Sequence, residues 1–305
     1  MLVVALPHYE FIRVSGADTV TFLQGQVSCD VTALTPERSL NGALCNLKGR
    51  VIADFRLLRQ GEDCLLQTYS GMARIILDVL NKYAVFSKVD LQLESAMSAA
   101  GVMGNGAAEI IAGLVGEAPQ PSDGVVQAEG FCVLAIAGPE PRFEIWAANE
   151  NPNHAKLDAL LRQGPAGELL DWQRQDFRAG LLHVTPELSE QYTPQLLNYD
   201  ISGVINFRKG CYTGQEVVAR MYYRGKAKKR LHLFQSDQAI SSAAEKPTSN
   251  FTLLAQAAPT ANDPDGHLLL AVVDSVQENT DGAQLVASDG SRLQKLDLPY
   301  LPSAA

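Results

Sequence analysis

The chain has 305 residues, 46% of them hydrophobic, which is enough apolar material for a globular protein and too much chain for one small core, so two or three packed units are expected. With 25 basic and 34 acidic residues the formal net charge is −9, which argues against non-specific binding to nucleic acid or to anionic membranes. No apolar run approaches a membrane span and no signal-peptide pattern opens the sequence, so we expect a soluble, cytoplasmic protein.

The first half of the sequence alternates strand and helix patterns. A short apolar strand at 11–14 and a turn at 15–18 precede a helix that begins near residue 20. Three strands at 40–47, 50–59 and 64–69 predict an antiparallel meander. Helical spacing of apolar residues then predicts a helix at 72–83, and alternation predicts a strand at 89–93.

Residues 101–124 are rich in glycine, alanine and proline around a weak helical pattern at 107–115, and we interpret them as a connection between two related α/β halves. Strands at 125–136 and 142–147, a helix at 153–163 and a helix within 168–180 follow. Beyond residue 230, short strands at 231–234, 268–274, 283–287 and 293–296 predict a small all-β unit.

The five cysteines and five histidines are scattered along the chain. No Cys-x-x-Cys pair occurs and the number of cysteines is odd, so neither a disulfide framework nor a stable metal site is expected.

The stretch from Lys209 to Glu216 carries the best argument for chemistry. Thr213 and Glu216 have the spacing of a capping box that opens a short helix, which would place Cys211 about one turn ahead of a helix N-terminus. The positive end of the helix dipole, with Arg208 and Lys209, would then favour a thiolate. The alternative is that Cys211 is a small, buried and inert side chain.

The octapeptide Lys-Gly-Cys-Tyr-Thr-Gly-Gln-Glu at 209–216, with Thr-Pro-Gln-Leu-Leu-Asn at 193–198 and Val-Ile-Asn-Phe-Arg at 204–208, closely resembles the signature of the YgfZ family. Members of this family are folate-binding proteins associated with tRNA modification, and their fold is related to that of the aminomethyltransferase of the glycine cleavage system. Further matches at 16–18, 22–26, 48–50, 82–86 and 298–300 extend the resemblance over most of the chain.

The resemblance implies an α+β fold. An aminomethyltransferase-like folate-binding region of two α/β units with mainly antiparallel sheets is expected at 1–225, divided near 101–124, followed by a C-terminal β-barrel at 226–305. The units are expected to form a ring around a channel.

The resemblance also implies a function. The expected cofactor is tetrahydrofolate, and the expected role is that of an accessory protein in the assembly or repair of iron–sulfur enzymes, including those that modify tRNA. The expected partners are iron–sulfur client enzymes such as tRNA methylthiotransferases. The alternative is a tetrahydrofolate-dependent transferase of one-carbon groups, aminomethyl or methyl; we favour the accessory factor.

Family matches provide the candidate site residues. Cys211 matches the cysteine on which the family depends, and Lys209 is the candidate support for its charge. Trp172 matches a tryptophan implicated in folate contact, and Tyr9 corresponds by register to a second aromatic residue. An ordinary core tryptophan on a helix is the other interpretation of Trp172.

Two departures from the related pattern concern the mechanism. Aminomethyltransferases carry paired acidic residues after the turn that matches Lys48-Gly49, one of them catalytic, whereas this chain has only Asp54. Asp54 could still hydrogen-bond a pterin, act as the acid–base group of the alternative enzyme, or simply face solvent. Arg178 stands where some relatives carry a glutamate, and could pair with the glutamate tail of folate or remain in solvent.

A local basic segment follows the octapeptide. Its interpretations are a solvated linker, a site that captures folate polyglutamate, and a surface that docks RNA phosphates. Because the segment is small, we favour polyglutamate over RNA and do not expect direct RNA binding. The segment comprises Arg220, Tyr222, Tyr223, Arg224, Lys226, Lys228, Lys229 and Arg230.

Overall fold

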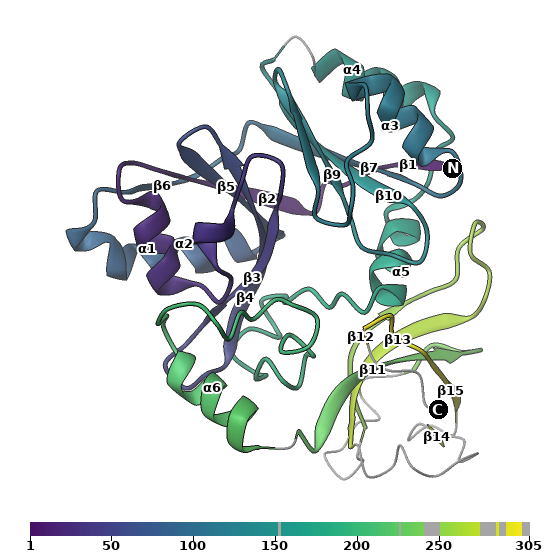
Figure 1. Ribbon diagram of the computed structural model, residues 1–305. Coiled ribbons are helices and arrows are strands. Elements are labelled where there is room, and N and C mark those ends of the chain that lie inside the picture. Colours follow the sequence, from purple (N-terminus) through teal and green to yellow (C-terminus); the bar gives the residue numbers. More distant parts are fainter. Residues whose placement is uncertain (152–153, 226, 241–250, 275–284, 287–290, 301–305) are drawn as a thin grey trace.

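Three antiparallel sheets of five strands each make up the fold and lie roughly at the corners of a triangle (Figure 1). The structure, a computed structural model, describes residues 1–151, 154–225, 227–240, 251–274, 285–286 and 291–300. No helix in these ranges is long and apolar enough to cross a membrane. The α+β class with antiparallel sheets is confirmed.

The first sheet contains the predicted meander and has the order β3-β4-β5-β2-β6. Its core side is covered by the helix predicted at 72–83, because that helix turns its buried apolar residues, such as Ile76 and Leu80, toward the sheet. The elements of this unit are β2 (Tyr9–Ser15), α1 (Thr19–Gln26), η1 (Val31–Ala33), β3 (Leu40–Cys45), β4 (Val51–Gln60), β5 (Asp63–Tyr69), α2 (Met72–Tyr83), η2 (Ala84–Phe86) and β6 (Asp90–Leu93).

The second sheet has the order β1-β7-β10-β9-β8, and α3 and α4 pack on it. Its edge strand β1 precedes the whole first sheet in sequence, yet Leu2 pairs with Met103 of β7. Neither β1 nor β7 was predicted from the sequence. The elements are β1 (Leu2–Ala5), β7 (Met97–Met103), α3 (Ala107–Val115), β8 (Val125–Ala128), β9 (Phe131–Ala135), β10 (Arg142–Ala148) and α4 (His154–Gln163).

The chain passes from the first sheet to the second between β6 and β7, at residues 94–96. The boundary expected near 101–124 therefore falls inside the second sheet's unit, because the glycine- and alanine-rich residues of β7 form a buried strand rather than a linker.

The third sheet has the order β12-β13-β11-β15-β14. Its strands are β11 (Lys229–Ser236), β12 (Phe251–Ala257), β13 (His267–Asp274), β14 (Leu285–Val286) and β15 (Arg292–Leu296), of which β12 was not predicted. In the described residues these strands form one open sheet, without the closed barrel that the resemblance implies. Most of the strand predicted at 283–287 lies outside the described residues.

Two further helices connect these units. α5 (Leu169–Arg178) ends before Gly180, which takes the left-handed φ of 69° that the predicted helix end requires, and α6 (Gln215–Arg224) precedes β11. Figure 1 shows α5 between the second and third sheets. Arg174 of α5 is fully buried there and reaches Asp263 at 2.8 Å.

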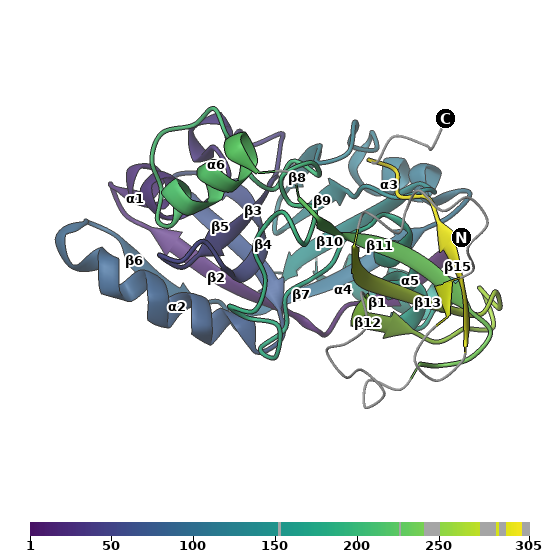
Figure 2. The ribbon, with the colours of Figure 1, turned by 90° about the horizontal axis from the view of Figure 1, so that it is seen from below.

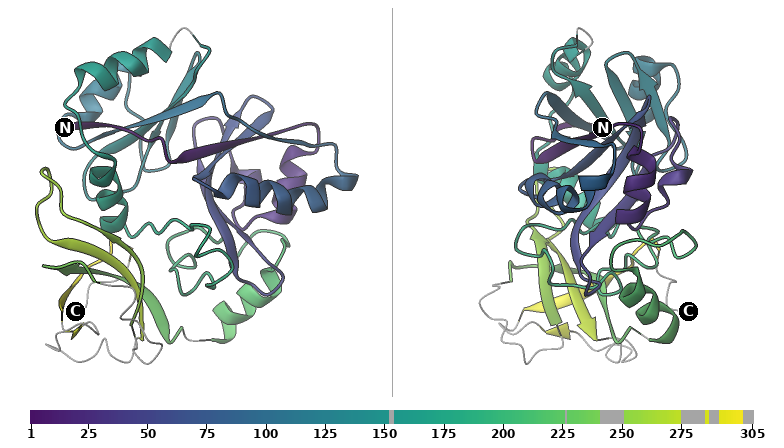
Figure 3. Two further views of the ribbon diagram at one scale, coloured as in Figure 1. Left: turned by 180° about the vertical axis from the view of Figure 1, so that it is seen from behind. Right: turned by 90° about the vertical axis from the view of Figure 1, so that its left-hand side faces the viewer.

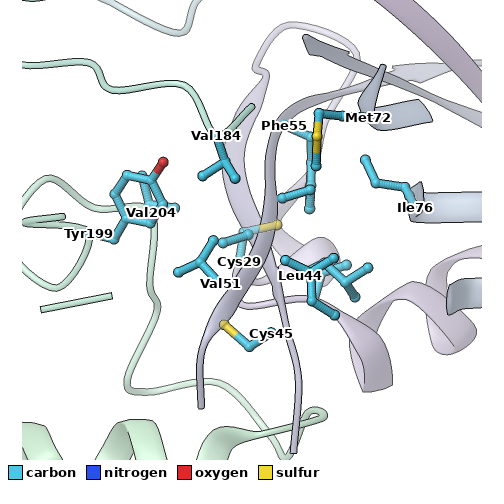
Figure 4. Close-up of a cluster of buried hydrophobic side chains, with 14 of the residues drawn as sticks. Cys29, Leu44, Cys45, Val51, Phe55, Met72, Ile76, Val184, Tyr199 and Val204 are labelled. Carbon is cyan, nitrogen blue, oxygen red and sulfur yellow. The ribbon is translucent and has the colours of Figure 1, made fainter. Parts of the chain in front are cut away.

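The segment between α5 and α6 has no regular secondary structure but contributes to the core of the first unit. Val184, Tyr199 and Val204 face Val51 of β4 in this cluster (Figure 4). Tyr199 also donates a 2.7 Å hydrogen bond to the carbonyl of Leu182, which joins two parts of the same segment. This packing places the residues after Gly180 against the sheet that carries Asp54.

Candidate functional site

A cavity of about 40 Å³ lies where the first sheet, the second sheet and the segment after α5 meet. Most of the polar side chains in its wall are ionisable. They include Tyr9, Asp54, Arg56, Glu144, Asp176 and His183. Two of the six predicted site residues, Tyr9 and Asp54, therefore lie in one wall, although they are far apart in the sequence.

Asp54 is held from two sides. Its Oδ1 accepts a 2.6 Å hydrogen bond from the backbone N–H of Val184, and its Oδ2 lies 2.8 Å from Nδ1 of His183. The ring of Tyr69 stacks on His183, with centroids 4.4 Å apart and planes 12° apart. Asp54 is thus neither a solvent-facing strand residue nor a free acid–base group; it orients the imidazole.

These contacts orient His183 and shift its pKa. Burial lowers its pKa most, but the charge of Asp54, the hydrogen bond to it and the charges of Asp176 and Glu144 together raise the pKa above its ordinary value. The ring of His8 is close to the same cluster, stacking edge-on against Tyr69 at 4.6 Å. Burial and then repulsion from His183 lower the pKa of His8 to about 4, so the pKa values of the two neighbouring histidines are shifted in opposite directions.

Asp176 presents an unused acceptor to the cavity. Its Oδ1 forms a buried ion pair with Nη1 of Arg142 at 2.8 Å. Its Oδ2 is buried, has no hydrogen-bond partner among the described residues, and lies 3.8 Å from Nε2 of His183. Because a buried carboxylate oxygen without a donor is unfavourable, this atom is suited to accept a hydrogen bond from a ligand.

Tyr9 lines the cavity, and Trp172 lies behind it. The Tyr9 hydroxyl donates to Oε1 of Glu144 at 2.9 Å and accepts from Nε1 of Trp172 at 3.3 Å. Burial raises the pKa of Glu144, and the side chains of Arg56 and Tyr9 oppose that effect. Trp172 itself is fully buried and is not among the residues that line the cavity, so the folate contact expected for it stays a prediction. It supports Tyr9.

Lys209 has a structural position. Its side chain is buried, and Nζ donates to the backbone carbonyls of Gln24, Val27 and Cys29 at 2.8, 2.6 and 2.8 Å. Burial lowers its pKa to about 8. The ammonium therefore fixes the backbone at the end of α1, and its support for the charge of Cys211 stays a prediction.

Cys211 is exposed, which excludes the interpretation of a buried inert thiol. The predicted capping box is wrong: α6 begins after Gly214, whose φ is 83°, and no side chain caps it. Thr213 instead donates to Gln26 at 3.0 Å. Glycine is required at position 214, because its φ is left-handed and a Cβ there would lie 2.3 Å from the carbonyl oxygen of Asn46. Cys211 is not among the residues that line the cavity.

Arg178 points away from the cavity. Its Nη2 lies 2.8 and 2.7 Å from the two oxygens of Asp263, which precedes β13. Arg174 shares the same carboxylate. Arg178 therefore joins α5 to the third unit, and its pairing with the glutamate tail of folate stays a prediction.

The residues of the basic segment lie in different local environments. Arg230 forms a bidentate ion pair with Asp200 at 2.9 Å, and the ring of Tyr222 stacks on Phe207 at 3.7 Å. The patch expected from the sequence is thus partly used inside the fold.

The sequence did not indicate His183, Asp176 or Glu144 as site residues. They come from three separate elements, and no spacing motif joins them; only the packing of the segment after α5 on β4 and β10 brings them together. In the described ranges no group of three His, Cys, Asp or Glu side chains is arranged to hold a metal ion.

Comparisons with known proteins place this architecture in a family. The chain is 30% identical over 305 residues to the tRNA-modifying protein YgfZ of Escherichia coli O6:H1, across 98% of this chain and 93% of that protein. The chain belongs to the YgfZ family. The YgfZ protein of Pectobacterium carotovorum subsp. carotovorum is 34% identical over 229 residues, which cover 75% of this chain and 68% of that protein. A scan against protein-family models finds no match.

The YgfZ fold of this chain also resembles a solved structure of an enzyme. The glycine cleavage system aminomethyltransferase T from Bartonella henselae superposes with a TM-score of 0.76 over 98% of this chain and 86% of that one, at 16% sequence identity. At that identity the similarity concerns the fold alone. It agrees with the aminomethyltransferase-like architecture predicted from the sequence.

Proposed function

We propose that this protein binds tetrahydrofolate at the cavity between its first two sheets and serves as an accessory protein in the assembly or repair of iron–sulfur enzymes, including those that modify tRNA. Two findings support the proposal: membership of a family whose relatives are named tRNA-modifying proteins, and a fold shared with an aminomethyltransferase. The partners would be enzymes such as tRNA methylthiotransferases, in the cytosol.

The observation that carries the folate assignment is the unpartnered Oδ2 of Asp176 beside His183. A tetrahydropterin presents adjacent N–H donors on its pyrimidine edge, and a buried carboxylate oxygen is their natural acceptor. The aromatic side chains of Tyr9 and Tyr69 supply flat apolar surface nearby. Residues that would hold the pterin are therefore Asp176, His183 and Tyr9.

The size of the cavity sets a condition on binding. Its volume of about 40 Å³ accommodates a few water molecules, whereas sites for molecules of folate size span roughly 300–1,000 Å³. Binding therefore requires side chains of the wall to move. The ring around a channel, the C-terminal barrel at 226–305 and the folate-binding region at 1–225 belong to the same proposal.

Cys211 has a different role in this proposal. Because it is exposed and outside the cavity wall, it would meet a partner protein or a metal–sulfur group that the partner carries, rather than the bound pterin.

Calorimetric titration of tetrahydrofolate into the full-length protein and into Asp176→Asn tests the assignment. The variant keeps the volume of the side chain but removes the charge that a pterin edge would face, so we expect binding at least about tenfold weaker, as for a lost charged hydrogen bond. Asp158→Asn, an exposed carboxylate on α4, is the matched control. Circular dichroism must show that each variant is folded.

Two results would count against the proposal in different ways. Equal affinity of wild type and Asp176→Asn would show that folate binds elsewhere. No binding of tetrahydrofolate to the wild type would refute the folate-dependent role itself.

A second candidate function is a tetrahydrofolate-dependent one-carbon transferase, and the Asp54–His183 pair favours it over a pure binding protein. In such an enzyme His183 would move the proton and Asp54 would position it, since both oxygens of Asp54 are already engaged. Turnover of an aminomethyl donor with tetrahydrofolate, lost in both His183→Gln and Asp54→Asn, would support this enzyme. Folate binding without turnover would leave the accessory role.

A further inference from the structure

A groove of about 450 Å³ lies on the surface beside the turn that joins β3 to β4. One side is the turn itself, another is the C-terminal end of α2, and Thr213 from the loop before α6 completes it. Figure 3 (right) shows the end of this hairpin between α2 and α6. None of its lining residues lines the folate cavity.

The groove is apolar inside. Cys45 and Ile52 are buried in its floor and Val79 of α2 is half-buried. Two large apolar side chains lie at its edge: Leu47, which is 74% exposed, and Tyr83, which is 43% exposed. Directly after Tyr83, η2 exposes Val85 (73%) and Phe86 (99%). Such exposure of neighbouring apolar side chains is typical of protein interaction sites.

The rim of the groove is cationic. Lys48, Arg50 and Lys82 line it, against a single carboxylate, Glu190. No ion pair joins these three cations to an acid within the described part of the chain. Arg50 also donates to the backbone carbonyl of Gln191, which holds its side chain but leaves its charge. Three cations beside a single carboxylate, on a protein of net charge −9, are complementary to an acidic partner.

The groove is also rigid on the hairpin side. The Asn46 side chain accepts from the backbone N–H groups of Lys48 and Arg50 at 2.9 and 3.0 Å, which fixes the turn. Gly49, with φ of 70°, packs against α6 so closely that a Cβ would meet Val217 at 2.8 Å. A surface that is fixed before binding loses little conformational entropy when a partner docks.

We propose that this groove docks an acidic segment of a partner protein, which inserts an apolar side chain between Leu47 and Tyr83 while its carboxylates meet Lys48, Arg50 and Lys82. Thr213 lies two positions after Cys211, so a docked partner sits next to the exposed thiol. The groove is the partner-binding face of the accessory role and rests on that role, but it does not depend on folate binding.

A protein segment suits this surface better than RNA. Phosphate contacts would use the cations, but the aliphatic side chains of Leu47, Ile52 and Val79 offer neither hydrogen bonds nor stacking surfaces to bases. Those aliphatic residues are what an apolar anchor of a peptide requires.

Peptide display against the full-length protein, followed by titration of synthetic copies of the selected peptides, tests the docking site. We expect the selected sequences to combine Asp and Glu with Leu, Phe or Trp. Their affinity should fall at least about tenfold in the double variant Lys48→Glu/Lys82→Glu and in Leu47→Ser, and should fall with added salt. Arg74→Glu, an exposed cation on α2 outside the groove, should bind as the wild type does.

A second measurement tests the placement beside Cys211. Bound peptide should slow alkylation of Cys211 by iodoacetamide at least severalfold, in protein with and without tetrahydrofolate. Selection of peptides without acidic residues, or equal binding to Lys48→Glu/Lys82→Glu, would overturn the docking site. Binding without protection of Cys211 would overturn its location, and a tRNA transcript that binds the wild type but not the double variant would assign the cations to RNA. Loss of folate binding in Asp176→Asn leaves all these outcomes unchanged, so the two proposals fail separately.

Discussion

Nδ1 of His183 lies 2.8 Å from Oδ2 of Asp54. The pKa of a residue that follows α5 therefore depends on a carboxylate carried by a strand of the first sheet. The ring of Tyr69 stacks on the same imidazole, and Nε2 of His183 lies 3.8 Å from Oδ2 of Asp176. His183 therefore couples two of the three carboxylates in the cavity wall, Asp54 and Asp176, and several consequences can be measured.

Asp54→Asn should lower the pKa of His183 relative to the wild type, because the charge and the hydrogen bond of Asp54 are lost and only Asp176 and Glu144 still oppose burial. The pKa of His8 should rise above about 4 in the same variant, since the charge on His183 contributes to its depression. Titration of the histidine C2 protons by NMR measures both. Opposite movement of the two values is the expected result; if only His183 moves, the two rings are not coupled.

The unfolding free energy should respond to acid through His8. Its pKa is about 4 in the folded protein and about 6.5 in the unfolded chain, so the unfolded state binds more protons between those values. The stability that neutral His8 provides is complete above pH 6.5 and is lost as the pH falls toward 4. His183, whose pKa is raised, acts in the opposite direction and stabilises below pH 6.5.

Urea unfolding of wild type and His8→Phe at a series of pH values checks this sign. The difference in unfolding free energy between them should shift in favour of the variant as the pH falls from 6.5 to 4. A difference that does not change with pH would show that His8 is not depressed.

Lys209→Met should destabilise the protein by about 2 kcal/mol, because three buried carbonyls lose their donor while the cost of burying a charge is relieved. Chemical denaturation of Lys82→Met, in which an exposed lysine of α2 is changed, serves as the comparison and should stay within about 0.5 kcal/mol of the wild type. Equal stability of the two variants would mean that Lys209 has another task.

In the native protein Cys211 should be the thiol that iodoacetamide modifies. The other four cysteines are buried, and burial raises the pKa of Cys29 and Cys45 to about 12 and of Cys64 to about 11. Mass spectrometry should find one modified cysteine in the folded chain and five after unfolding. Cys211→Ala should abolish native labelling and change stability by less than about 0.5 kcal/mol.

Periodic elements were predictable and irregular ones were not. The helix expected at 72–83 is α2, residue for residue, because its apolar positions recur at helical spacing. β7 was missed because it contains several small residues. Gly101 leaves room for α5, since a Cβ at that position would lie 2.4 Å from the Trp172 ring. Its composition is that of a linker, and its burial comes from tertiary packing.

The site was predictable where a motif marks the chain and not where the fold assembles it. Tyr9 and Asp54 were expected and do share a wall. The octapeptide located Cys211 but misassigned its neighbours, since a lysine beside a cysteine in sequence can point into the core, as Lys209 does. His183 and Asp176 could not be expected, because their partners Asp54 and Arg142 lie on strands of two different sheets.

The pairing of Leu2 with Met103 has a consequence for biosynthesis. β1 leaves the ribosome before every strand of the first sheet, yet its partner β7 emerges only after all of them. The first sheet can therefore form on the nascent chain before β1 has a strand to pair with, and until then the apolar residues Val3 and Val4 of β1 are uncovered. That interval is when the chain is open to chaperones or to pairing with another molecule, and truncation before residue 97 would make the exposure permanent.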